Sequence, residues 1–253
     1  MRALVRLVVL ALACALVAWA LVTRPSLPAA ERGRRLAERT GCFGCHGPGG
    51  LKGVPNHGRL DKTVPGFGGD EMMYAKNDDD LREWIRDGVT ARRAASSTWK
   101  SDRDRGALRM PAFGRRLSAA EVNDLVAFVN ASAGNPGPGD GDSLAVAGLD
   151  RADALGCTGC HGAGGRLAMR NPGSLKGYVP SWDGRDFPDL VRNRAEFDQW
   201  VMYGISNRFR ENPAAGFFLH RAAVHMPPYL HHAGRGDLDA LWAYVTWLRR
   251  TLH

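Results

Sequence analysis

The chain has 253 residues, of which 44% are apolar and 24% charged, a composition typical of globular proteins. This length allows one large domain or two small ones. The formal net charge of +8 favours acidic partners or anionic surfaces. Nucleic-acid binding is not expected, because the basic residues are scattered through both halves and form no stripe interleaved with aromatic residues.

The N-terminal segment has the pattern of an export signal. Arg2 and Arg6 precede an unbroken apolar run from Leu7 to Val22. The run is intermediate between the apolar core of a cleavable signal, about 7–15 residues, and a membrane-spanning helix, about 17–25 residues. We therefore interpret residues 1–25 as a signal peptide or a membrane anchor, with the anchor favoured. In both cases the following chain is expected on the periplasmic side of a bacterial inner membrane.

Three helical segments are expected in the first half. The first covers about residues 30–39 and the second about residues 79–88. The third begins at a capping box formed by Ser118 and Glu121. Its apolar residues recur at the spacing of one helical face: they are Val122, Leu125, Val126 and Val129.

A strongly basic segment from Ala91 to Arg109 lies between the last two of these helices. It holds six basic and two acidic residues. We interpret it as a solvated loop, and the alternative is a docking surface for an acidic partner protein.

A CxxCH motif occurs once in each half of the chain. The six motif residues are Cys42, Cys45, His46, Cys157, Cys160 and His161, and the remaining cysteine, Cys14, lies in the N-terminal apolar run. Two disulfides, a structural zinc site and a thioredoxin-like pair are the alternatives. None of them explains why a histidine follows the second cysteine twice. The two pairs are also too far apart for an ordinary zinc site, and no βαβ pattern surrounds them.

The motif fits covalent attachment of a haem. Two thiols at this spacing add across the two vinyl groups of a haem, and the next residue then lies beneath the iron, where an imidazole is a proximal ligand. Cys42 and Cys45 are therefore expected to hold one haem c with His46 on its iron. The second motif is expected to hold another in the same way. Such attachment takes place outside the cytoplasm, in agreement with the N-terminal segment.

The two halves are copies of one unit. Cys42 corresponds to Cys157, and after one inserted residue Met110 corresponds to Met226. Matching helices are expected over about residues 145–155 and 195–204, followed by a last helix whose apolar face holds Leu238, Leu241, Trp242 and Val245. We divide the chain into a first domain over residues 30–131, a linker over 132–143 and a second domain over 144–253.

Met110 and Met226 are the expected sixth ligands of the two irons. Both lie shortly before the last helix of their unit, and a thioether ligand stabilises ferrous iron and raises its potential. One alternative is that the methionines only pack on the haem edge. In the second unit a histidine is a rival ligand, or the iron stays open: the candidates are His220, His225, His231 and His232.

Each unit resembles a class I cytochrome c, and the pair resembles a membrane-attached dihaem cytochrome, over Ala30 to Leu252. The resemblance implies a mainly α fold. It consists of two tandem cytochrome-c-like helical domains, each wrapped around one covalently bound c-type haem and preceded by an N-terminal apolar helix.

The resemblance also implies two kinds of packing around each haem. A glycine of the first helix packs on an aromatic residue of the last, which here pairs Gly33 with Phe128 and Gly148 with Tyr244. A proline carbonyl accepts a hydrogen bond from the proximal histidine. Pro55 matches this position, and Pro172 is a weaker match.

These features favour an electron-transfer protein over an enzyme. Two haems with histidine and methionine ligands would carry electrons between extracytoplasmic or membrane redox partners. These partners are expected to have acidic docking surfaces. The N-terminal segment is expected to contact the membrane. One alternative is a haem enzyme or ligand-binding subunit with one open iron, such as a dihaem peroxidase, which needs acid/base groups over that iron. Another is the cytochrome subunit of a larger dehydrogenase or reductase.

Overall fold

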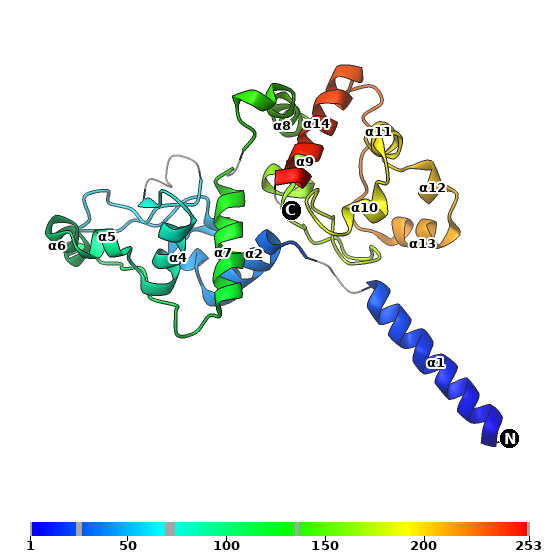
Figure 1. The fold of residues 1–253 in the computed structure, drawn as a ribbon, viewed down its shortest axis with the longest axis horizontal. Coiled ribbons are helices and arrows are strands. Elements are labelled where there is room, and N and C mark those ends of the chain that lie inside the picture. Colours follow the sequence, from blue (N-terminus) through cyan, green and yellow to red (C-terminus); the bar gives the residue numbers. More distant parts are fainter. Residues whose placement is uncertain (1, 24–26, 69–73, 135–136, 252–253) are drawn as a thin grey trace.

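The computed structural model describes residues 2–23, 27–68, 74–134 and 137–251. Over these ranges the chain is helical, and strand pairing is limited to isolated bridges between Pro55 and Thr63 and between Arg170 and Tyr178. Figure 1 shows a first lobe (residues 27–68 and 74–134), a second lobe (residues 137–251) and one projecting helix. The expectation of a mainly α fold is confirmed.

The projecting helix is α1, Arg2–Thr23. Its large apolar side chains from Val5 to Leu21 are between 51% and 68% exposed, so they belong to neither core. Among the helices of the described residues, none is long and apolar enough to cross a membrane. Residues 1 and 24–26 of the segment interpreted as a signal peptide or membrane anchor lie outside the described ranges.

The first lobe is organised by two helices that pack on each other, α2 and α7. The elements are α2 Ala29–Thr40, α3 Phe43–His46, η1 Pro48–Gly50, α4 Asp78–Asp87, α5 Ala91–Ala94, α6 Ser97–Arg105 and α7 Ala119–Ser132. The two long helices meet at Gly33, where a Cβ atom would lie 1.8 Å from the carbonyl oxygen of Asp124 and 2.9 Å from Cβ of Phe128. Glycine is therefore required there, and the predicted packing of Gly33 on Phe128 is confirmed.

The second lobe repeats this arrangement with α8 and α14. Its elements are η3 Asp140–Asp142, α8 Ser143–Ala154, α9 Cys157–His161, η4 Ala163–Gly165, α10 Phe187–Leu190, α11 Arg194–Tyr203, α12 Asn207–Arg210, α13 Pro213–Arg221 and α14 Arg235–Thr251. A Cβ on Gly148 would lie 2.0 Å from the carbonyl oxygen of Ala240 and 2.7 Å from Cβ of Tyr244. The predicted packing of Gly148 on Tyr244 is confirmed as well.

Short polar signals set the starts of the main helices. Ser118 and Glu121 form the predicted capping box of α7. Asn77 caps α4 and Asn193 caps α11, each accepting from the N–H of the third helical residue, at 2.9 and 3.0 Å. The helices predicted over residues 30–39, 79–88, 145–155 and 195–204 all begin within two residues of these expectations.

The segment from Ala91 to Arg109 is not the expected loop, because α5 and α6 occupy most of it. The two helices begin where the hydroxyls of Thr90 and Ser96 accept from backbone N–H groups, at 3.3 and 3.2 Å. The residue that α6 buries is Asp102, which is acidic. Hydrophobic periodicity therefore gave no sign of this helix.

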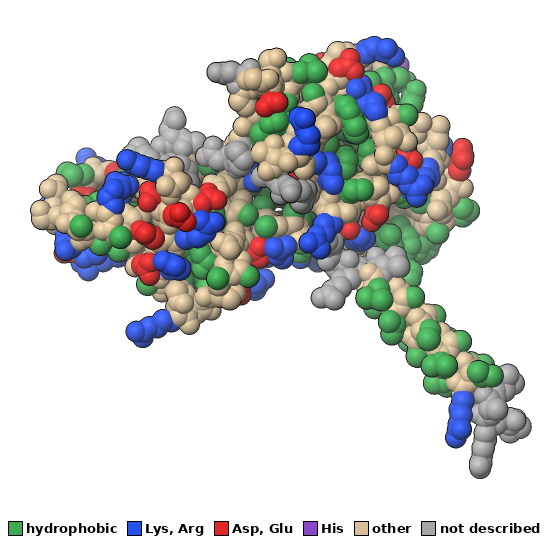
Figure 2. Space-filling model, in the orientation of Figure 1, with side chains coloured by type: hydrophobic (Ala, Val, Ile, Leu, Met, Phe, Trp, Pro, Cys, Tyr) green, Lys and Arg blue, Asp and Glu red, His purple; other side chains and the backbone are tan. Residues whose placement is uncertain are grey.

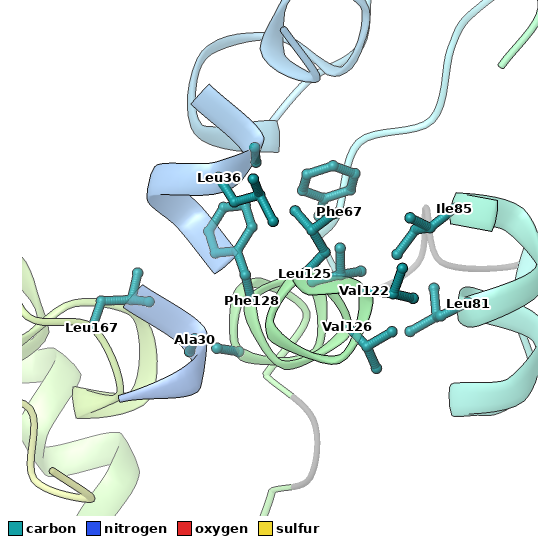
Figure 3. Packing of buried hydrophobic residues seen from close by; sticks show 13 residues of the cluster. Ala30, Leu36, Phe67, Leu81, Ile85, Val122, Leu125, Val126, Phe128 and Leu167 are labelled. Carbon is teal, nitrogen blue, oxygen red and sulfur yellow. The ribbon is translucent and has the colours of Figure 1, made fainter. Parts of the chain in front are cut away.

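Each lobe has an apolar core, and one side chain of the second lobe enters the core of the first. The first core gathers around α7, as Figure 3 shows; its labelled members include Leu36, Phe67, Leu81, Ile85, Val122, Leu125, Val126 and Phe128. Leu167 follows the second CxxCH motif, is 7% exposed and belongs to this cluster. It lies close to Ala30 of α2 in Figure 3. The loop after His161 thus holds the two lobes against each other.

Candidate haem sites

Both CxxCH motifs fold as a short helix that directly follows a longer one. Gly41 and Gly156 precede the motifs with left-handed backbone, at φ +81° and +75°, a conformation that glycine adopts at low cost. Cys157 and Cys160 lie within α9, whereas Cys42 is the N-cap residue of α3 and Cys45 lies within it. In both motifs the thiols are three residues apart, on one side of a helical turn. In the first lobe the N–H of Cys42 donates to the carbonyl of Ala37 at 2.9 Å, which fixes the motif to α2.

The four motif cysteines are free thiols rather than disulfides. In the described ranges no group of three or more His, Cys, Asp or Glu side chains is placed to hold a metal ion. Neither the disulfide nor the zinc alternative is therefore supported by the structure.

Each motif histidine is oriented by a proline carbonyl. The Nδ1–H of His46 donates to the carbonyl oxygen of Pro65 at 2.7 Å, and that of His161 donates to Pro180 at 2.8 Å. A carbonyl oxygen only accepts, so Nδ1 carries the proton and the lone pair is on Nε2. Each imidazole is therefore held in the tautomer that binds iron through Nε2.

The expected prolines were the wrong ones. Pro55 lies in an isolated bridge with Thr63, and its place in the second lobe is taken by Arg170, which is bridged to Tyr178. Pro65 and Pro180 correspond to each other in the internal repeat, whereas Pro55 and Pro172 do not. The repeat alignment therefore contained the signal that would have identified the correct pair.

Burial keeps both imidazoles neutral. Desolvation lowers the pKa of His46 and of His161 below the usual value, against the opposing effect of the proline hydrogen bond. The ring of His46 lies 4.7 Å from that of Phe67, and the ring of His161 lies 5.1 Å from that of Trp182, between centroids. A neutral imidazole packed on an aromatic ring is ready to act as a ligand.

Met110 and Met226 have the same backbone setting. A Cβ on Gly88, which ends α4, would lie 2.4 Å from the carbonyl oxygen of Met110. A Cβ on Gly204, which ends α11, would lie 2.3 Å from that of Met226. Both methionine side chains are half-buried, Met110 against the first core and Met226 against the second. The repeat therefore extends to the backbone around both methionines, and their role as sixth ligands stays a prediction.

Two buried asparagines, which the sequence did not single out, hold the methionine loops. The Asn56 side chain donates to the carbonyl of Leu108 at 3.0 Å and accepts from its N–H at 2.9 Å. Asn171 makes the same pair of bonds to Val224, both at 2.9 Å. Leu108 and Val224 each lie two positions before a methionine. The asparagines therefore hold the backbone from which each methionine side chain extends. Their correspondence in the repeat was the available signal.

A cavity of ≈ 250 Å³ in the first lobe brings the predicted groups together. Its walls include Cys42, Cys45, His46 and Met110. Apolar side chains from the core complete one part of the wall: Leu81, Ile85, Leu125, Phe128 and Val129. The CxxCH motif and Met110, which is 64 positions after His46, thus face one largely apolar space.

Another part of the cavity wall is polar. It is formed by Asn56, Arg59, Asp61, Tyr74, Trp99 and Arg103. The Nε1–H of Trp99 is buried and finds no hydrogen-bond acceptor among the described residues. A buried donor without a partner is costly, which indicates that a ligand carries the acceptor. An apolar macrocycle with carboxylates along one edge, such as a haem, fits this division of the wall.

The rival histidines of the second lobe are poorly placed as ligands. His225 donates from Nε2 to the carbonyl of Leu219 at 2.6 Å, at the end of α13. His220, His231 and His232 are exposed. Met226, in contrast, packs on the core that also contains Cys157. The methionine is therefore the better-placed candidate.

Comparison with known proteins gives one family. Residues 30–133 match the model of the cytochrome c family, and no curated protein matches the chain. A chain of the reducing HAO-like protein complex of Kuenenia stuttgartiensis is 15% identical, with a TM-score of 0.29, over 88% of this chain and 99% of that one. A TM-score this low establishes no shared fold. The family match covers the part of the chain that contains the first CxxCH motif, the cavity and Met110.

Proposed function

We propose that the chain is a dihaem c-type cytochrome that carries electrons between redox partners outside the cytoplasm. The observation that carries the proposal is the shared cavity of the first lobe. His46, with Nε2 free of the proline hydrogen bond, lines it together with both thiols and the thioether of Met110. These are the groups that a c-type haem with histidine and methionine ligands requires.

We infer a second haem in the second lobe from the repeated local geometry. His161 donates to Pro180 as His46 does to Pro65, and Met226 lies against Gly204 as Met110 lies against Gly88. This supports a division into a first domain over residues 30–131, a linker over 132–143 and a second domain over 144–253. Cys157 and Cys160 would hold the second haem by thioether bonds.

The side chains favour a carrier over an enzyme. Iron in a bound haem supplies one-electron oxidation and reduction, and a thioether ligand favours its ferrous form. The hydrogen bond from His46 to Pro65 fixes the imidazole, while Phe67 and Phe128 keep water from its face. Met110 and Met226, as ligands of the two irons, would leave no coordination position for a substrate.

We place the haem-bearing part of the chain on the periplasmic side of a bacterial inner membrane. Covalent haem attachment takes place outside the cytoplasm, and Arg2 and Arg6 before an apolar run are typical of export. This location does not require α1 to span the membrane.

We also propose that the basic segment with α5 and α6 docks an acidic redox partner. Arg92 and Lys100 are exposed there, whereas Asp102 is buried in ion pairs with Arg59 and Arg105. Electron exchange with such a partner should slow as ionic strength rises. A rate that does not respond to salt would contradict this docking.

The test of the carrier function is the visible spectrum of the haem-loaded protein, reduced, with and without carbon monoxide. We expect the gas to change nothing, because the histidine and methionine of each site would hold the two ligand positions on its iron. Met110→Ala should make about half of the haem respond, Met226→Ala the other half, and the double variant all of it. A response of half the haem in the unaltered protein would contradict the proposal and favour an enzyme or ligand-binding subunit.

The number of haems is tested separately by mass. The protein should carry two covalent haems, and replacing Cys42 and Cys45, or Cys157 and Cys160, by serine should remove one each time. A single haem that is lost only with the first pair would overturn the second site and leave the first intact.

A further inference from the structure

The helices α6 and α13 occupy the same place in the two lobes. A Cβ on Gly58 would lie 2.0 Å from the carbonyl oxygen of Arg105, the last residue of α6. A Cβ on Gly173 would lie 1.9 Å from that of Arg221, the last residue of α13. Each helix is therefore anchored at its end by the same close approach to a loop glycine.

The chemistry of the two helices is opposite. In α6, Asp102 is 7% exposed and forms ion pairs with Arg59 at 3.2 Å and Arg105 at 3.0 Å. When α6 and α13 are aligned on their last residues, Phe218 aligns with Asp102, and Phe217 aligns with Ser101. Since the fold is built with polar residues at these places, it does not require the two phenylalanines.

The phenylalanines form an exposed apolar surface with the helix that projects from the molecule. Phe217 is 57% exposed, and its ring lies 5.2 Å from that of Phe218. The ring of Trp19, in α1, lies 5.8 Å from Phe218. We call Trp19, Phe217 and Phe218 the Phe217 patch. Figure 2 shows hydrophobic side chains along α1 and on the adjoining edge of the second lobe.

A cation borders the Phe217 patch. The guanidinium of Arg221 lies 5.3 Å from the centre of the Phe217 ring. Its side chain is exposed, and within the described ranges it forms no ion pair. Aromatic residues beside an exposed arginine are a combination that binds a lipid surface, since the rings enter the boundary between headgroups and acyl chains and the cation reaches the phosphates.

We propose that the Phe217 patch rests on a lipid surface with anionic headgroups. The alternative occupants are a second copy of the chain and a protein partner. Lipid is favoured because α1 is continuous with the patch and exposes apolar side chains on all its described turns, at 51% to 68%. Such a helix offers no single face to a protein. The apolar surface of α1 and the Phe217 patch meet at the contact of Trp19 with Phe218. The same lipid surface would therefore cover both.

The test is hydrogen–deuterium exchange of the full-length, haem-loaded chain with and without vesicles of phosphatidylcholine and phosphatidylglycerol. We expect the vesicles to slow amide exchange in α13, while α6, its counterpart in the first lobe, stays unchanged. Protection confined to α1 would overturn the proposal. Protection of α13 that rises with protein concentration in the absence of lipid would overturn it in favour of a second copy.

Variants separate the patch from α1. Phe217→Ser, which introduces the residue found in α6, should weaken partitioning into these vesicles roughly fivefold, from the apolar area that it withdraws. Leu60→Ser is the matched control, because Leu60 is 76% exposed in the first lobe and should have no effect. Arg221→Gln should weaken binding to the anionic vesicles and not to pure phosphatidylcholine. Equal binding by Phe217→Ser and Leu60→Ser would contradict the proposal. Amide exchange and vesicle partitioning do not depend on the irons. A negative result here would therefore leave the proposed electron transfer untouched, and the reverse also holds.

Discussion

In the first lobe the motif histidine packs on Phe67, and Phe67 on Phe128, whereas in the second lobe it packs on Trp182, and Trp182 on Tyr244. The hydroxyl of Tyr244 donates to the carbonyl of Gly164 at 2.8 Å. Burial raises the pKa of Tyr244 to about 12, so it remains a donor at physiological pH. At this position Phe128 of the first lobe contributes packing alone, whereas Tyr244 of the second lobe also donates a hydrogen bond to the loop after the CxxCH motif.

The opposite difference occurs at the polar edge of the site. Arg59 in the first lobe pairs with Asp61 and Asp102. Burial by itself raises the pKa of Asp61, but hydrogen bonds from Arg59 and Tyr74 outweigh it and hold the pKa below its usual value. In the second lobe serine and phenylalanine stand in place of Arg59 and Asp102. The two lobes thus keep the hydrogen bond from histidine to proline and the backbone setting of the methionine, while polar residues farther from the motif differ.

The helix crossing is where the two lobes should behave most alike. Gly33→Ala would force a methyl group against Asp124 in the first lobe, and Gly148→Ala against Ala240 in the second. We expect each to lower the free energy of unfolding by about 1–3 kcal/mol or more, because overpacking here meets backbone that cannot move aside. Chemical denaturation measures the effect. Gly236→Ala is the control, since nothing lies within 4 Å of its added Cβ. If only one lobe were affected, the crossings would not be equivalent.

The asparagine clamps should also act alike in the two lobes. Asn56→Ala removes two hydrogen bonds to Leu108, and Asn171→Ala two to Val224, each change costing about 1–3 kcal/mol. Because the clamp precedes the methionine, we expect the haem of the altered lobe to respond to carbon monoxide. Asn130→Ala, at an exposed pair with Asp78, is the control and should change little. Loss of stability without a gas response would make the clamp purely structural.

Much of this could be predicted because the signals are local and occur twice. The CxxCH motifs, the capping box at Ser118 and the glycines Gly33 and Gly148 each act on neighbours along the chain or on a repeated helix pair. Even the mistaken choice of Pro55 could be corrected within the sequence, since of Pro55 and Pro65 the second alone has a proline counterpart in the repeat.

Other features could not be predicted, because they depend on where distant segments meet. Asp102 is buried in α6 through Arg59, a partner 43 positions away, so no apolar pattern marks the helix. Leu167 enters the core of the other lobe, and the unpaired Nε1–H of Trp99 matters only because the fold directs it to a cavity. Tertiary placement decides each of these.

Trp99 tests whether the polar wall of the cavity in the first lobe contributes to haem binding. Trp99→Phe removes the buried donor, for which the second lobe has an alanine at the equivalent place. With the haem attached, we expect a loss of about 1–2 kcal/mol in the free energy of unfolding, since a hydrogen bond to a carboxylate is lost. In a Cys42→Ser, Cys45→Ser background the same change should be nearly neutral. An equal loss in both backgrounds would mean that the indole only packs on Trp84.

The smallest expected effect is the pH dependence of stability that one ion pair of the second lobe contributes. Hydrogen bonds from Arg208 lower the pKa of Glu196 to about 2 from a usual 4.5, against the opposing effect of burial. A carboxyl group whose pKa is depressed by folding contributes stability that is present above the unfolded pKa and lost as pH falls through the folded one. The contribution should therefore disappear between pH 4.5 and about 2, and for a pair at the surface it should be less than about 1 kcal/mol. Glu196→Gln should remove this part of the acid dependence, as measured by thermal melts at each pH. The counterpart of this pair in the first lobe, Asp80 with Arg92, is separated by 3.5 Å rather than 2.8 Å. Thermal melts of Glu196→Gln that keep the full acid dependence of the unaltered chain would contradict this prediction.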